Sequence, residues 1–169
     1  GFWWSIHAYR GCSHACTYCF ARPTHEYLGL DIGEDFERRI VVKVNAVDLV
    51  RAETDPRRWD GSSVHLGSNT DPYQPAEGRY RLTRGILEVF AERANPVSIL
   101  TKSPLVLRDA DVLAGLAARA AVSVTMSIGT LDEGAWRLSE PGAPHPRRRL
   151  DALARLRDVG IDVAVLMAP

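Results

Sequence analysis

The sequence predicts an α/β fold in which about five parallel strands form a barrel or partial barrel. Short apolar and β-branched runs alternate with longer segments whose apolar residues recur at helical spacing. Alternation of this kind is typical of parallel strands joined by right-handed crossovers. The runs are apolar on both faces, as expected for buried parallel strands. With 169 residues, the chain has the length of one domain, which we expect to span residues 1–169.

Each predicted strand is a short apolar or β-branched run. The first strand enters a cysteine-rich loop, and the second runs into a polar loop, residues 68–75, that contains two prolines. Another β-branched run lies in the long insertion after the cysteines and is expected to form an extra strand. The main strands are expected at residues 5–9, 64–67, 97–101, 121–128 and 161–167, and the extra strand at residues 40–44.

Helices are expected between the strands, with residues at their ends that fit the preferences of helix termini. Asn45 can cap the first of them. Pro104 suits the first turn of another, where the missing N–H of proline would have had no partner. Gly160 is a natural stop after the last one. The expected helices are residues 46–53, 82–94, 104–118, 133–138 and 147–159.

The end of the predicted series is unusual. The fifth strand is followed by neither a helix nor a sixth strand. We therefore expect the chain to be the N-terminal part of a longer barrel, truncated after the fifth strand. The alternative is a complete domain that ends on an edge strand.

Three cysteines, the only ones in the chain, follow the first predicted strand. Cys12, Cys16 and Cys19 have the spacing C-x3-C-x2-C. Thiolates are soft ligands that suit zinc, cuprous copper or iron–sulfur clusters, and an odd number of cysteines disfavours a disulfide framework. A four-iron cluster held by three thiolates leaves one iron open for chemistry. An iron–sulfur cluster is the favoured interpretation; zinc would need a fourth ligand, for which His14 and His25 are the nearest candidates.

The composition narrows the class of protein. Hydrophobic residues make up 46% of the chain, enough for a core, and 21 basic residues balance 21 acidic ones. This balance gives no overall attraction to nucleic acid or to a membrane surface. No apolar run is long enough for a membrane span. Reduced cysteines indicate a reducing compartment, so we expect a cytoplasmic protein.

Polar residues follow the predicted strands at the ends where parallel α/β folds bind their ligands. The second strand is followed by Ser68, Asn69, Thr70 and Asp71, the third ends at Thr101 and Lys102, and the fourth ends at Ser127. Together they could bind a polar cofactor that carries a carboxylate. Alternatively, residues 68–71 form a plain turn and Ser127 is a buried hydroxyl bonded to backbone. Lys102 opposes the dipole of the helix that follows, which favours a ligand or carboxylate partner.

The cysteine motif, with Tyr18 before the third cysteine, resembles the cluster motif of the radical S-adenosylmethionine (radical SAM) superfamily. The wider chain resembles the branch related to spore photoproduct lyase, whose members are described as DNA repair photolyase-like. The matching segments are residues 8–27, 67–77, 99–102, 123–128 and 165–169. They cover nearly the whole chain in order, and they imply a partial (β/α) barrel of the radical SAM core type.

The resemblance also implies cofactors and a reaction. Family members hold a [4Fe-4S] cluster on the three cysteines, and the amino and carboxylate groups of S-adenosylmethionine chelate the fourth iron. One electron, from a donor such as flavodoxin or ferredoxin, then yields a 5′-deoxyadenosyl radical that abstracts hydrogen from a substrate. By motif, the cofactor-binding positions are Cys12, Cys16, Cys19, Tyr18, Ser68, Asn69, Thr70, Lys102 and Ser127. Neither a catalytic residue nor a substrate is indicated.

One departure from the lyase pattern bears on function. The lyase has a hydrogen-donating cysteine in the loop after the second strand, whereas residues 67–71 contain none here. This difference argues against thymine-dimer repair by that route. The main hypothesis is a radical SAM enzyme with an unidentified substrate. A DNA lesion lyase and a non-catalytic iron–sulfur or zinc protein remain as alternatives, and the neutral net charge argues mildly against nucleic acid.

Overall fold

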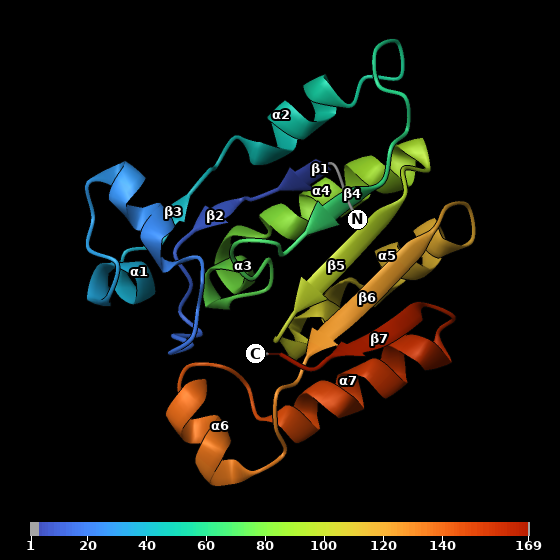
Figure 1. Ribbon diagram of the computed structural model, residues 1–169. Helices are drawn as coiled ribbons and strands as arrows, with labels where there is room; N and C mark the ends of the chain where they lie inside the picture. Colours follow the sequence, from blue (N-terminus) through green and yellow to red (C-terminus); the bar gives the residue numbers. More distant parts are fainter. Residues whose placement is uncertain (1–3, 169) are drawn as a thin grey trace.

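The computed structural model describes residues 4–168 and contains one parallel five-stranded sheet with helices packed along it (Figure 1). The strand order is β1-β4-β5-β6-β7, and every neighbouring pair is parallel, which confirms the predicted α/β class and the five parallel strands. Trp3, at the start of the first apolar segment, and Pro169, in the last matching segment, lie outside the described residues. The strands are β1 (Trp4–Ile6), β4 (Val64–Leu66), β5 (Val97–Thr101), β6 (Val122–Ser127) and β7 (Asp162–Leu166).

The first predicted strand is in fact two strands. After β1, the chain bends and continues as β2 (Tyr9–Arg10), which pairs antiparallel with β3 (Val41–Val42) in a small second sheet. The expected extra strand is therefore present, although shorter than predicted. The prediction of one strand over residues 5–9 is wrong because the chain leaves the main sheet after Ile6.

The five predicted helices are all present, with one difference in type. The helix expected from Pro104 begins as a 3-10 segment, η2 (Pro104–Asp109), before it becomes α5. Asn45 stands at the predicted N-cap of α2, but its side chain forms no capping hydrogen bond with any described residue. The bounds are α2 (Ala46–Glu53), α4 (Leu82–Arg93), α5 (Ala110–Ala117), α6 (Glu133–Ser139) and α7 (Pro146–Asp158).

Three short helical segments were not predicted. They are η1 (Arg22–Leu28), α1 (Glu34–Arg38) and α3 (Pro75–Tyr80). Both η1 and α3 have proline in the first turn, where the missing N–H does not break the hydrogen-bond pattern. The two prolines of the polar loop therefore do not keep it irregular: the second begins α3.

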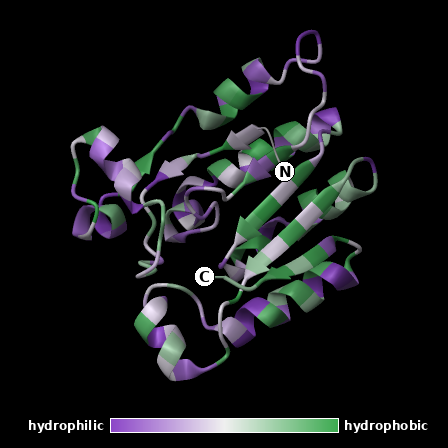
Figure 2. Cartoon of the chain, in the orientation of Figure 1, coloured by the Kyte–Doolittle hydropathy of each residue, from purple (hydrophilic) through white to green (hydrophobic). Residues whose placement is uncertain are grey.

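One face of the sheet packs on the helices and forms the core. Along β5 and β6, buried apolar residues alternate with less buried ones, and Figure 2 shows the corresponding alternation of hydropathy. The buried set meets the apolar faces of α4, α5 and α7. It includes Val97, Ile99, Val124 and Met126 from the strands, and Leu87, Phe90, Leu113, Leu116 and Leu156 from the helices.

The expectation that the strands are apolar on both faces is wrong, because the opposite face of the sheet carries a row of polar side chains in register. Ser5, His65, Ser98, Ser123 and Asp162 pair in sequence across the five strands. The imidazole Nδ1 of His65 lies 2.8 Å from the hydroxyl oxygen of Ser98. This layer differs from the bulky branched residues that usually fill the inside of a complete eight-stranded α/β barrel. None of the helices among residues 4–168 has the length and apolarity needed to span a membrane.

The loops that carry the predicted site meet at the carboxyl edge of the sheet, because all five strands run in the same direction. β2 leads into residues 11–20, called here the cysteine loop, and β4 leads into residues 67–74. Gly67 allows these elements to approach closely: its φ is +107°, and a Cβ there would lie 2.0 Å from the carbonyl oxygen of Leu100. Only glycine fits at the end of β4.

Candidate cofactor site

A cavity of about 130 Å³ lies between the cysteine loop, residues 67–71 and the ends of β5 and β6. The nine residues that the sequence assigned to cofactor binding all line this cavity, so the fold brings together positions that are far apart in the chain. They are Cys12, Cys16, Tyr18, Cys19, Ser68, Asn69, Thr70, Lys102 and Ser127. Their assignment as ligands stays a prediction, whereas their position around one cavity is a finding.

The three cysteines are free thiols, and Cys12 and Cys16 are buried. Burial raises the pKa of Cys16 to about 12, although the ammonium group of Lys102 acts in the opposite direction. Burial also raises the pKa of Cys19. Cys16 and Cys19 are therefore protonated at neutral pH, and a bound metal centre is the kind of partner that would stabilise their thiolates.

The donor set fits an iron–sulfur cluster. Three soft sulfur ligands share one cavity with an amine and several hydroxyl groups. Among residues 4–168, no three His, Cys, Asp or Glu side chains converge closely enough to hold a single metal ion. The two candidates for a fourth zinc ligand already have other partners in the protein, although His14 lines the cavity and its ring also interacts with Cys12. His14 pairs with Asp71, and the ring Nε2 of His25 donates to the backbone carbonyl of Arg39 at 3.2 Å.

Asp71 joins the cysteine loop to the end of β5. Its carboxylate accepts hydrogen bonds from the hydroxyl of Thr101 and the backbone N–H of Lys102, both at 2.7 Å, and lies 3.2 Å from Nδ1 of His14. Burial opposes ionisation of Asp71, but His14 and these hydrogen bonds lower its pKa to about 2. Burial likewise opposes protonation of His14, but Asp71 raises its pKa to about 10. Asp71 and His14 therefore form a buried ion pair in the wall of the cavity.

Thr70 was predicted to bind the cofactor through its hydroxyl group, but that hydroxyl donates within the protein. Its Oγ1 donates a hydrogen bond to the backbone carbonyl of Tyr9 at 3.0 Å, so its single donor is used within the protein. The oxygen can still accept from a ligand in the cavity. Thr70 is therefore first of all a link between the loop after β4 and the strand that enters the cysteine loop.

Lys102 has a carboxylate nearby, as its position predicted, and two further partners that were not predicted. Its Nζ lies 2.9 Å from the hydroxyl of Ser127 and 3.6 Å from the carboxylate of Glu140. The ring centroid of Tyr18 is 5.6 Å away, within the range of a cation–π contact. An ammonium group has three donors, and Ser127 takes one. Lys102 thus retains hydrogen-bonding capacity for a ligand.

Glu140 and Arg149 are site residues that the sequence analysis missed. Glu140 accepts a hydrogen bond from the hydroxyl of Tyr18, and its other oxygen lies 2.6 Å from Nη2 of Arg149. Arg149 also donates to the backbone carbonyls of Ser127 at 2.9 Å and Pro144 at 2.8 Å. Burial opposes ionisation of Glu140, but Tyr18 and Arg149 lower its pKa. These contacts hold the wall of the cavity next to Lys102.

Three consecutive arginines, residues 147–149, would ordinarily form a solvated basic face at the start of a helix, but Arg149 is fully buried. The helical period could have revealed this. Arg149 precedes Ala152, Leu153 and Leu156 by three, four and seven residues, and these three line the buried face of α7. A charged residue on an apolar stripe indicates a buried partner.

Comparison with known proteins agrees with this architecture. A family model described as the radical SAM superfamily matches residues 6–168. An uncharacterized protein of Mycobacterium tuberculosis is 46% identical over 168 residues, which are 99% of this chain and 49% of the relative. One from Methanocaldococcus jannaschii is 32% identical over 164 residues, which are 97% of this chain and 59% of that protein. The chain thus spans about half the length of the curated relatives that it matches.

A solved structure resembles the whole chain. Spore photoproduct lyase in complex with a dinucleoside spore photoproduct superposes with a TM-score of 0.73 over 98% of this chain and 45% of the lyase. The sequence identity in this match is 19%, so the similarity concerns the fold. It is consistent with the predicted partial barrel.

Proposed function

The chain belongs to the radical SAM superfamily, and from this premise we propose that it works as a radical SAM enzyme with a [4Fe-4S] cluster and S-adenosylmethionine in the cavity at the strand ends. The proposal rests on one observation: three free thiols line the same cavity as Lys102 and Ser127. Soft ligands for iron and polar groups for an organic cofactor lie in the same walls. When bound, the cluster and S-adenosylmethionine supply reductive cleavage and hydrogen-atom abstraction.

In this proposal, Cys12, Cys16 and Cys19 bind the cluster and Lys102 binds the carboxylate of S-adenosylmethionine. Lys102 suits this role because its ammonium group has three N–H donors. One of them bonds to Ser127, and the carboxylate of Glu140, 3.6 Å away, is beyond hydrogen-bond distance. The other donors are therefore available to a ligand. Ser127 can still donate its own proton to a ligand, since its oxygen faces the ammonium group. A carboxylate placed between them would gain charge-assisted hydrogen bonds.

The other cavity residues bind and orient the cofactor. Tyr18 presents a ring whose hydroxyl is fixed by Glu140, which limits the ring to one orientation. Ser68 and Asn69 supply polar groups for the methionine or ribose part, and Thr70 supplies an acceptor. The reductant is a protein electron donor of the flavodoxin or ferredoxin kind, and the substrate is an organic molecule not yet identified.

Anaerobic reconstitution tests the proposal. The protein is loaded with iron and sulfide and reduced in the presence of S-adenosylmethionine, and 5′-deoxyadenosine is measured by chromatography. We expect its formation in the wild type and its loss in Cys16→Ala, which should also fail to hold the cluster. Purification of a protein with a single zinc ion, four protein donors and no affinity for S-adenosylmethionine would show instead a structural or redox-sensing metal site.

A further inference from the structure

We propose that the cysteine loop is held in its ligand-ready shape by two clamps outside it: the side chain of Gln74 on one flank and the turn at Gly142 on the other. The inference rests on the proposed iron–sulfur site, and it makes both residues positioning residues for the three thiols. Neither of them lines the cavity. Outer residues that fix metal ligands commonly control metal affinity.

The first clamp is a buried amide. Gln74 is fully buried, its Nε2 donates to the carbonyl of Gly11 at 2.9 Å, and its Oε1 accepts from the backbone N–H of Ser13 at 3.2 Å. These two bonds lie on either side of Cys12 in the chain. The side chain of Gln74 therefore fixes the backbone that presents the first thiol.

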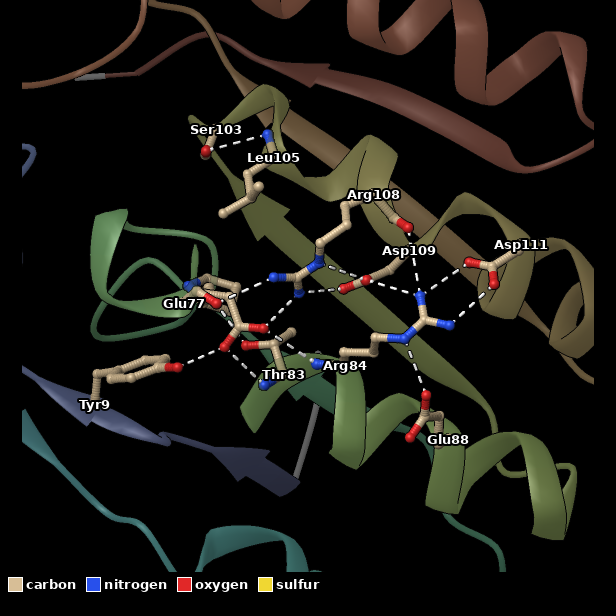
Figure 3. Close-up of polar contacts among 11 residues, drawn as sticks. Tyr9, Glu77, Thr83, Arg84, Glu88, Ser103, Leu105, Arg108, Asp109 and Asp111 are labelled. Atoms are coloured by element: carbon tan, nitrogen blue, oxygen red, sulfur yellow. Dashed lines mark hydrogen bonds and ion pairs between the residues drawn. The ribbon is translucent and has the colours of Figure 1, made fainter. Parts of the chain in front are cut away.

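The helix that follows Gln74 anchors the entry to the cysteine loop as well. Glu77 in α3 is fully buried and accepts hydrogen bonds from the hydroxyl of Tyr9 at 2.5 Å and from Nη2 of Arg108 at 2.6 Å (Figure 3). The backbone N–H of Thr83 also donates to it, at 2.9 Å. The guanidinium group of Arg108 compensates the charge of this buried carboxylate, and the neutral donors Tyr9 and Thr83 fix its orientation. Gln74 is thus attached to a fixed support.

The second clamp comes from the turn after α6. The backbone N–H of Gly142 donates to the carbonyl of His14 at 3.0 Å, and the carbonyl of Ser139 accepts from Thr17 at 2.9 Å. A Cβ at position 142 would lie 2.1 Å from the carbonyl oxygen of Ser13. Backbone cannot swing away from such a contact, so any side chain at this exposed position must displace the segment between Cys12 and Cys16.

The cysteine loop itself needs such support. Ala15, between the first two thiols, has a φ of +53°, in the left-handed region that residues with a Cβ avoid. Its backbone N–H makes only a long bond, 3.3 Å, to the carbonyl of Cys12. Strained backbone of this kind persists where the surrounding structure determines it. The clamps at Gln74 and Gly142 are the surroundings that do so here.

The test compares each clamp with a matched control. Gln74→Met removes both hydrogen bonds at similar volume, and its control is Asn95→Leu. Asn95 is also a buried amide at the opposite edge of the sheet; it accepts from Trp59 at 2.6 Å and donates to the backbone carbonyls of Pro96 at 2.9 Å and Ser62 at 3.2 Å, so its loss is at least as severe as that of Gln74. Gly142→Ala is compared with Gly115→Ala in α5, where an added Cβ has no described atom within 4 Å.

Two measurements decide the outcome. After anaerobic reconstitution, the rate of iron release to a ferrous chelator should rise about 10- to 100-fold in Gln74→Met and Gly142→Ala, but not in the controls. Titration of the metal-free proteins with Cd²⁺, which needs only two of the thiols, followed by thiolate-to-metal absorption, should show weaker binding in the same two variants. Thermal unfolding of the metal-free proteins separates these effects from loss of fold, since Asn95→Leu should be destabilised at least as much as Gln74→Met.

The proposal is overturned if both clamp variants release iron and bind Cd²⁺ as the wild type does. A wild type that takes up no cluster contradicts the proposed function, and the Cd²⁺ titration then still decides whether the clamps position the thiols. Equal weakening in clamp variants and controls would also overturn the proposal, because it would show a general loss of stability.

Discussion

Arg149 and Glu140 form a buried ion pair, with Nη2 and Oε2 2.6 Å apart, directly behind the cavity wall that carries Tyr18 and Lys102. Arg149 is fully buried and Glu140 nearly so. The pair fixes the carboxylate, and the carboxylate in turn fixes the hydroxyl of Tyr18. A tertiary contact between a loop and α7 thereby orients two residues that we propose as cofactor ligands.

The first prediction concerns this pair. Arg149→Leu should lower the free energy of unfolding by about 3–5 kcal/mol, because it leaves Glu140 as a buried charge without its main partner. The double variant with Glu140→Gln should recover part of this loss. Arg137→Leu, which breaks the exposed pair with Glu133, should change stability by less than about 1 kcal/mol. Urea denaturation measures all three, and equal effects of Arg149→Leu and Arg137→Leu would contradict the prediction.

The second prediction concerns cofactor affinity. The chain has two lysines, Lys43 and Lys102, so each can serve as the control for the other. Lys102→Ala should retain the cluster and weaken the binding of S-adenosylmethionine about 10- to 100-fold, the value of a hydrogen bond to a charged group. Lys43→Ala should bind it as the wild type does. Anaerobic equilibrium dialysis gives both constants, and an unchanged constant in Lys102→Ala would remove this residue from the binding site.

The third prediction is a pH dependence. The folded pKa of Asp71, about 2, lies below the usual value for aspartate of about 3.9. Its ionised form therefore stabilises the fold above about pH 4, and this contribution, about 3 kcal/mol, is lost as the pH falls toward about 2. Asp71→Asn should flatten this part of the stability profile of the metal-free protein. Asp151→Asn, at an exposed position of α7, should keep the wild-type slope in urea melts at successive pH values.

The fourth prediction tests the close approach of β4 and β5. Gly67→Ala combines a left-handed φ with a Cβ 2.0 Å from the carbonyl oxygen of Leu100, and it should cost more than about 3 kcal/mol. Gly61→Ala has a similar φ of +77° but no described atom within 4 Å of the added Cβ. It should cost only about 1 kcal/mol. Chemical denaturation compares them, and similar losses would show that backbone conformation alone matters at Gly67.

The sequence predicted the main sheet and the position of the site for a clear physical reason. Each strand of the sheet is a separate apolar run, and parallel strands bring their carboxyl ends to one edge. Lys102 and Ser127 could therefore be placed beside the cysteines without knowledge of any contact. Short elements such as α1 and α3 were missed because five or six residues carry too little periodicity to be recognised.

The sequence alone does not reveal hydrogen-bond and ion-pair partners that depend on tertiary packing. Glu140 follows α6 in a segment with no periodic pattern; its partner Tyr18 is 122 residues away in the chain, and its partner Arg149 lies in the next helix. Thr70 was expected to use its hydroxyl on a ligand, but the nearby carbonyl of Tyr9 takes its proton. A residue type indicates what a group can bond, whereas the choice among available partners depends on distances that only the folded chain defines.

The polar row from Ser5 to Asp162 determines what can close over the inner side of the half-barrel. The hydroxyl, imidazole and carboxylate groups of this row need hydrogen bonds, either to water or to the groups that displace the water. A segment or ligand that seals this surface must therefore bring its own donors and acceptors, because each group left unsatisfied costs about 1–3 kcal/mol. A purely apolar segment would leave these groups without partners, so a polar segment or ligand suits this face of the sheet.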